Sequence, residues 1–105
     1  STQWRLVVVH QPIAVPRHGE RHNVLHGAAH AVRRWAVAGV DLILGGHSHL
    51  PYVLPLGAVW PNLPRAMWAV QAGTATSTRV RAGAPNSCNL LTLCADETGR
   101  RGVVE

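Results

Sequence analysis

Residues 42–51 read LILGGHSHLP: a short apolar run is followed by two glycines and then by two histidines that one serine separates. The apolar run, extended back to Val40, has the composition of a β-strand that is buried on both faces. The two glycines allow the backbone to turn sharply and to come close to a ligand. His47 and His49 are therefore either solvated turn residues or metal ligands.

Two regular elements are predicted before this strand. Residues 5–10, RLVVVH, form another apolar run of the type found in strands buried on both faces. Residues 23–38 repeat apolar side chains at helical spacing, with Asn23 as a suitable N-cap and Gly39 as a C-terminal stop. Strand, helix and strand in this order predict a βαβ unit whose two strands are parallel.

Parallel strands end at the same edge of a sheet, and open α/β sheets bind ligands at that edge. His10 is therefore expected to lie beside His47 and His49, which favours the metal-ligand interpretation. In an extended backbone the rings of His47 and His49 would point the same way, with Cα atoms about 6.5 Å apart. That spacing suits one shared ion, or two ions about 3.5–4 Å apart with one ring on each.

Another set of histidines lies on the predicted helix, at positions 22, 26 and 30. Residues spaced by four share one helix face and can bind zinc. These three, however, lie on the side away from the apolar stripe of Leu25, Val32 and Trp35. We therefore interpret them as part of a solvated polar face.

After Pro51 the pattern changes to short apolar pieces that turn residues separate. They predict strands, mostly antiparallel, over residues 52–56, 66–72, 78–81, 88–94 and 102–104. Along one strand Cys88 and Cys94 would stand about 20 Å apart, whereas a disulfide needs Cα atoms about 4.4–6.8 Å apart. Both are expected to be free thiols, buried as small apolar side chains, as suits a reducing cytoplasm.

Composition limits the function classes. The 105 residues are 47% hydrophobic and contain no apolar run of about 18 residues, so we expect a soluble, cytoplasmic α/β domain and no membrane segment. The net charge of +5 comes from ten arginines and no lysine. Because these arginines are scattered, without a basic run or interleaved aromatic residues, the sequence does not favour a nucleic-acid partner.

The acidic residues are few: Glu20, Asp41, Asp96, Glu97 and Glu105. Asp41 is predicted at the end of its strand farthest from the histidines. Two divalent ions about 4 Å apart repel each other strongly, so a two-metal site needs a bridging carboxylate. Either the chain holds one ion on three histidines, or acidic ligands come from residues that it does not contain.

The segments VVVHQP (7–12), GVDLILGGHSH (39–49) and WAVQAGTATSTRVRAGAPNSCNLL (68–91) together resemble the C-terminal half of a calcineurin-like metallophosphoesterase, close to the cyclic-nucleotide-phosphodiesterase-like branch. The resemblance implies a four-layer αββα sandwich that hydrolyses phosphate esters or phosphodiesters with two divalent transition-metal ions (Mn, Fe or Zn). It implies that His10 and His47 bind one ion and His49 the other. The usual His-His-Pro of the family is His10-Gln11-Pro12 here. Structural roles are expected for the other residues that match: Asp41, Thr74, Ser77, Arg79 and Asn86.

The first half of the family pattern has no counterpart in this chain. Its Asp-x-His pair, its bridging Asp in Gly-Asp, and its Gly-Asn-His with the catalytic His do not occur, which agrees with the shortage of carboxylates. We therefore expect residues 1–105 to be a single partial domain, the C-terminal portion of a phosphoric ester hydrolase. It would be inactive alone, without a catalytic residue of its own, and would associate with itself or with the missing N-terminal half. The alternative is a non-catalytic module that binds one metal ion through His10, His47 and His49, or serves as an interaction module.

Overall fold

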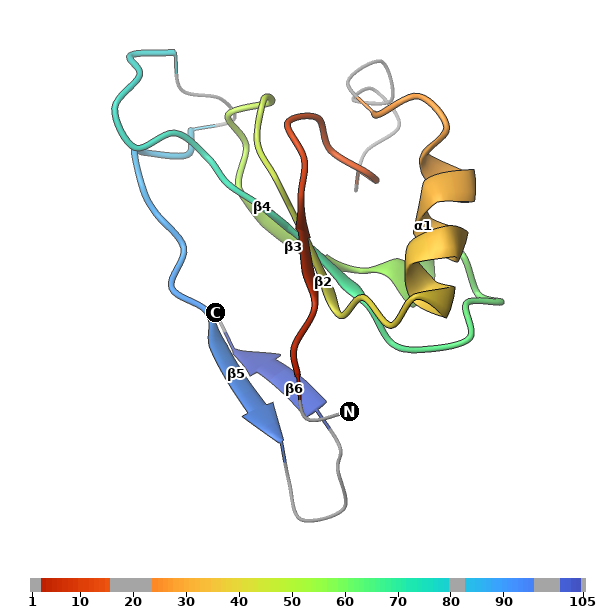
Figure 1. The fold of residues 1–105 in the computed structure, drawn as a ribbon. Helices are drawn as coiled ribbons and strands as arrows, with labels where there is room; N and C mark the ends of the chain where they lie inside the picture. The colour runs from red at the N-terminus through yellow and green to blue at the C-terminus, as the bar shows by residue number, and fades with distance from the viewer. Residues whose placement is uncertain (1–2, 16–23, 80–82, 96–100, 105) are drawn as a thin grey trace.

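The computed structural model describes residues 3–15, 24–79, 83–95 and 101–104. Within these ranges one α-helix lies beside a mixed four-stranded sheet, and a two-stranded sheet follows (Figure 1). In chain order the elements are β1 (Leu6–Val8), α1 (Ala28–Val37), β2 (Leu42–Gly45), β3 (Tyr52–Pro55), the 3-10 turn η2 (Leu56–Ala58), β4 (Trp68–Gln71), β5 (Thr92–Ala95) and β6 (Arg101–Val104). The predicted α/β class is confirmed. The described part of the chain contains no helix with the length and apolar character needed to cross a membrane.

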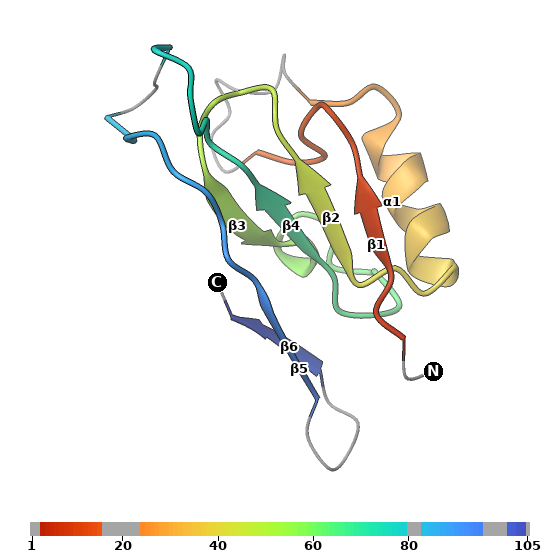
Figure 2. The same cartoon turned by 60° about the vertical axis from the view of Figure 1, so that its left-hand side comes forward.

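The strands of the larger sheet follow the order β1-β2-β4-β3 (Figure 2). β1 pairs with β2 in parallel, which confirms the predicted βαβ unit. β4 also pairs with β2 in parallel, and β3 pairs with β4 in the antiparallel sense. The prediction of mostly antiparallel strands after Pro51 is confirmed, since β4 is antiparallel to β3 and β5 to β6; the exception is the parallel pairing of β4 with β2. The chain reverses direction before and after β3, so β4 runs the same way as β2 and inserts between β2 and β3.

Because β1, β2 and β4 are parallel, the loops that follow them emerge at one edge of the sheet. We call this the histidine edge; it is formed by residues 9–15, 46–51 and 72–79. Backbone hydrogen bonds continue the pairing to the beginning of these loops, from Val9 N to Leu44 O (2.9 Å) and from Ala72 N to Gly45 O (2.8 Å). The histidine edge is thus a continuation of the sheet rather than a set of free loops.

The core lies between α1 and one face of the sheet. Ala28, Val32 and Ala36 form the buried stripe of the helix, and they belong to the same buried cluster as Ile43 of β2 and Ala69 of β4. The small alanines allow the helix to come close to the sheet. On the other side of the helix His30 is exposed, and so is His26 just before it, as expected for a solvated polar face; His22 lies outside the described residues.

The two ends of α1 differ in how well the sequence predicts them. The C-terminal end is as predicted: Gly39 has φ +89°, and the N–H groups of Gly39 and Val40 donate to the carbonyls of Ala36 and Trp35, which is a Schellman motif. The N-terminal end is not as predicted, because residues 24–27 are not helical. Leu25 N donates to Pro12 O (2.8 Å) and Gly27 is left-handed, so the helix begins only at Ala28, after a contact with a distant loop. Asn23, the predicted N-cap, lies outside the described residues.

The face of the sheet opposite α1 is also apolar. Alternation along paired strands places on it Leu6 and Val8 of β1, Leu42 and Leu44 of β2, Trp68 and Val70 of β4, and Val53 of β3. Leu42 and Val70 are buried, but the side chains at the sheet margins are exposed, Val8 to 75% and Leu6 to 44%. The prediction that the first strand is buried on both faces is wrong, because β1 is an edge strand whose Leu6 and Val8 side chains are exposed on this face.

Exposure of this face predicts self-association. Val8→Lys should weaken it, because a lysine on an edge strand opposes strand pairing and removes apolar area. Light scattering over a range of chain concentrations measures the effect: the apparent mass of the unmodified chain should rise with concentration, and that of Val8→Lys should rise less. Val37→Lys is the matched control, since Val37 is exposed to 82% on the far side of α1. A monodisperse monomer for the unmodified chain would contradict this prediction.

Three further expectations for the C-terminal part change. Thr78 and Arg79 are not in a strand, while residues 80 and 81 lie outside the described ranges. The predicted strand at 88–94 begins only at Thr92, and β5 pairs with β6 in the antiparallel sense as expected (Figure 2). Cys88 and Cys94 are free thiols, as predicted, but both are exposed, because this segment runs past the sheet instead of becoming part of its core.

Candidate metal centre

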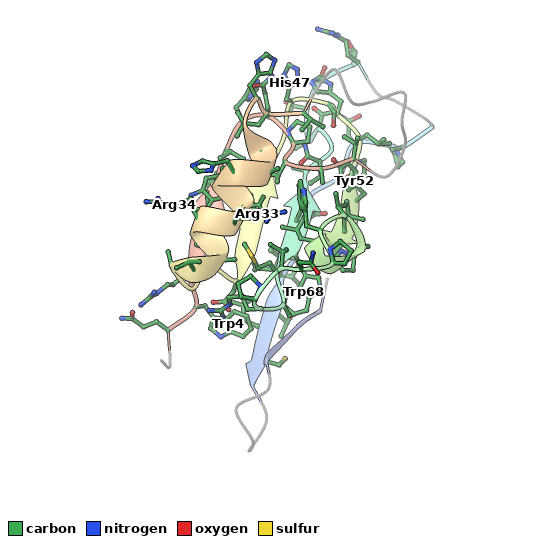
Figure 3. All side chains as sticks on the ribbon, turned by 90° about the vertical axis from the view of Figure 1, so that its right-hand side faces the viewer. Trp4, Arg33, Arg34, His47, Tyr52 and Trp68 are labelled. Atoms are coloured by element: carbon green, nitrogen blue, oxygen red, sulfur yellow. The ribbon has the colours of Figure 1, made fainter. Side chains whose placement is uncertain are left out.

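The predicted ligands lie on loops of the histidine edge, and Figure 3 shows one of them, His47, at the end of the larger sheet away from Trp4 and Trp68. His10 follows β1, and His47 and His49 follow β2. The two strands are neighbours in the sheet. The strand order therefore brings together residues that are far apart in the sequence.

His10 and His47 are in direct contact. The Nε2 atom of His10 lies 3.0 Å from the Nδ1 atom of His47, and the rings meet edge to face with their centroids 4.8 Å apart. Both side chains are exposed. Without a metal ion, one of these nitrogens must carry a proton and donate a hydrogen bond, which the other nitrogen accepts. The pair thus presents two facing ring nitrogens at a solvent-accessible position.

The backbone of the HSH segment is not extended, contrary to the expectation from its alternating pattern. His47 and His49 have φ values of +71° and +59°, in the left-handed region that favours glycine. The two rings consequently turn to different partners, His47 to His10 and His49 to Arg79. This division agrees with one ring on each of two ions better than with both rings on one ion.

His49 is oriented by a main-chain carbonyl. Its Nδ1 atom lies 2.7 Å from the carbonyl oxygen of Arg79. A carbonyl can only accept a hydrogen bond, so Nδ1 is the protonated nitrogen and Nε2 of the neutral ring keeps its lone pair. A histidine that donates one ring N–H to a carbonyl and binds a metal through the other nitrogen is the usual arrangement at metal sites.

The loop that carries this carbonyl is built by its own side chains. Ser77 N donates to Thr74 Oγ1 (2.9 Å), Arg79 N donates to Ser77 Oγ (3.0 Å), and Asn86 Nδ2 donates to Ser77 O (2.9 Å). These contacts are structural, as expected for the four residues. They also place the Arg79 carbonyl, and through it they orient the ring of His49.

The distance within the histidine pair fits a shared metal ion. Two nitrogens that bind one ion with bonds of about 2.1 Å lie about 3.0–3.4 Å apart when the bond angle is between about 90° and 109°. The observed 3.0 Å is inside this range. The described residues do not, however, bring three or more His, Cys, Asp or Glu side chains close enough together for one ion, so His49 does not complete a three-histidine site with the pair.

No described carboxylate accompanies the histidines. Asp41 precedes β2, at the opposite end of the strand from Gly45, and is 2% exposed. It accepts hydrogen bonds from Arg5 N (2.9 Å) and from Nη2 of Arg65 (2.6 Å), which gives it the structural role that was expected. The remaining acidic residues lie outside the described ranges: Glu20, Asp96, Glu97 and Glu105.

Two residues that the sequence does not predict as part of the site support the histidine loops. Gln71, the last residue of β4, donates through Nε2 to the carbonyl of Gly46, next to His47. Tyr52 donates to the carbonyl of Ala14 (2.6 Å), in the loop that begins at His10. The sequence does contain a signal for Gln71: it is a glutamine that ends the apolar strand WAVQ, at the same edge as two histidine loops.

No family model, curated protein or solved structure matches the chain.

Proposed function

We propose that this chain supplies the histidine side of a two-metal phosphoesterase centre, with His10 and His47 on one ion and His49 on the other. The observation that carries the proposal is the 3.0 Å contact between Nε2 of His10 and Nδ1 of His47. Two exposed imidazoles from neighbouring parallel strands face each other at a separation that suits a shared ion. The separate orientation of His49, with its Nε2 lone pair available, supports assigning it to a second ion.

The chemistry of such a centre follows from the ions. When bound, a pair of divalent ions produces a nucleophile from water and offsets the negative charge on the phosphoryl oxygens. In this chain His10, His47 and His49 would bind the ions as neutral imidazoles, and the Arg79 carbonyl would hold the ring of His49. Neutral imidazole suits Fe and Zn, whereas Mn would depend more on the carboxylate ligands of the centre. A phosphate ester or phosphodiester is the proposed substrate class.

The acidic ligands of this centre are proposed to come from outside the chain. Asp41 is committed to Arg5 and Arg65 at the far end of β2, and a two-metal centre needs carboxylates to balance the charge of the ions. The apolar side chains exposed on the face opposite α1, Leu6 and Val8 above all, support the same idea, since a second sheet packed there would complete a four-layer αββα sandwich. The chain would then be the C-terminal portion of the domain.

An activity assay tests whether the centre is incomplete. With Mn²⁺ and bis(p-nitrophenyl) phosphate, a generic phosphodiester, the 105-residue chain should show no turnover above that of Mn²⁺ alone. Robust turnover that His47→Ala abolishes would show that the chain contains a complete active site. The matched control is His30→Ala, which removes an exposed histidine from α1, away from the histidine edge.

Metal stoichiometry separates this proposal from a single-metal module. A chain that contributes only imidazoles should bind metal weakly, and elemental analysis after gel filtration should find well under one ion per chain. One tightly held ion per chain, lost in each of His10→Ala, His47→Ala and His49→Ala, would favour the non-catalytic module instead.

A further inference from the structure

Gln71 is a buried polar residue at the histidine edge. Its side chain is 2% exposed, and its Nε2 group donates to the carbonyl of Gly46. Asn89 Nδ2 in turn donates to the carbonyl of Gln71 (3.3 Å). A glutamine at this depth requires hydrogen-bond partners, and the partner of its side chain is the peptide bond that leads directly into His47.

Gly46 is held from two sides. Its N–H donates to the carbonyl of His10 (3.0 Å), and its carbonyl accepts from Gln71. The residue between the β2 strand and His47 is thus tied to His10 through one group and to β4 through the other. The position of the His47 ring relative to the His10 ring depends on both ties.

Gly45 makes room for this arrangement. It is paired with Gln71 across β2 and β4. A Cβ atom on residue 45 would lie 2.6 Å from Oε1 of Gln71, a distance at which one of the two must move. The glycine at position 45 therefore permits the close approach of Gln71, and the two residues act together.

We propose that Gln71 is a positioning residue that holds the ring of His47 against the ring of His10. Its consequence for metal binding rests on the function proposed above. Groups that orient metal ligands typically change metal affinity by about 10- to 100-fold when they are replaced. Gln71 would act in this way without touching the ion.

The first test is Gln71→Met, which keeps the length of the side chain and removes the donor. NMR should show contacts between the ring protons of His10 and His47 in the metal-free chain and their loss in the variant. The Kd for Co²⁺, followed by visible absorption, should rise about 10- to 100-fold. Arg65→Gln is the matched control: it destabilises the opposite end of the sheet and should leave the ring contacts and the Kd for Co²⁺ unchanged.

The second test separates positioning from space filling. Gly45→Ala should lower both stability and Co²⁺ affinity, because its Cβ displaces Gln71. In Gly45→Ala/Gln71→Ala the collision is removed, so stability should recover in part, while the Co²⁺ affinity and the ring contacts should stay lost. Recovery of the ring contacts together with stability would overturn the proposal, and so would unchanged contacts in Gln71→Met.

The two measurements, the NMR contacts between the rings and the Kd for Co²⁺, also distinguish failure of the role of Gln71 from failure of the proposed function. If the unmodified chain does not bind Co²⁺ through His10 and His47, the proposed function fails, but the ring contacts still decide the role of Gln71. If the chain binds Co²⁺ and Gln71→Met binds it equally well with its ring contacts intact, the role of Gln71 fails and the proposed function stands.

Discussion

His47→Ala should raise the Kd of the chain for Co²⁺ about 100-fold or more, a larger effect than the loss of a group that only orients a ligand. The change removes one of the two nitrogens that lie 3.0 Å apart, and a single imidazole on an exposed loop retains little affinity for a divalent ion. Titration followed by visible absorption of Co²⁺ measures the loss. The fold should survive, because His47 is exposed and is not a member of the buried core cluster.

A double-mutant comparison sharpens this prediction. If His10 and His47 share one ion, His10→Ala should weaken binding about as much as His47→Ala, and the double variant should be little weaker than either single variant. His30→Ala should have no effect, since this exposed histidine lies on α1. Equal losses in His30→Ala and His47→Ala would mean that Co²⁺ binds to scattered surface histidines instead.

Asp41→Ala should lower the free energy of unfolding by about 2–3 kcal/mol, because it leaves a partly buried N–H group and a guanidinium without their acceptor. The carboxylate connects the residue before β1 with the residues before β4, through Arg5 N and Nη2 of Arg65. Arg65 is partly exposed, so water compensates for part of the loss. Urea denaturation measures the change.

Two comparisons check the origin of that loss. Arg65→Gln should destabilise less than Asp41→Ala, since Asp41 keeps its bond from Arg5 N. Asp41→Asn should also be intermediate, because an amide oxygen still accepts from Arg5 N but carries no charge. A loss under about 0.5 kcal/mol for Asp41→Ala, the usual range for an unimportant surface change, would contradict this account of the carboxylate.

The parts of the fold that the sequence predicts well depend on local patterns. Two apolar runs and a helical repeat predict β1, α1 and β2, and their order predicts that His10 and His47 meet at one edge. Gly39 predicts the end of α1 because helices often end on a residue in the left-handed conformation, which glycine adopts most easily since it has no Cβ atom. Each of these predictions depends on neighbours within a few residues or on the general geometry of βαβ units.

The parts that the sequence does not predict depend on contacts between distant segments. α1 begins later in the chain than predicted because the main-chain N–H of Leu25 is hydrogen-bonded to Pro12 O. β4 is parallel to β2 because the chain reverses direction before and after β3 and inserts β4 between β2 and β3. The alternating HSH pattern predicts an extended backbone, yet Gly46 is held by His10 and Gln71, and the next residue turns left-handed. Neither β4 pairing nor the role of Gln71 follows from periodicity.

The left-handed backbone at positions 47 and 49 has a consequence for selection. A residue with a Cβ atom is disfavoured there by about 1–2 kcal/mol, whereas glycine is not. The stability of the fold alone therefore favours glycine over histidine at these positions. A library randomised at both positions and selected only for resistance to proteolysis should accumulate glycine and asparagine. Selection for retention on immobilised Co²⁺ should restore histidine at position 47, which would separate what the loop needs to fold from what its imidazoles are there to do.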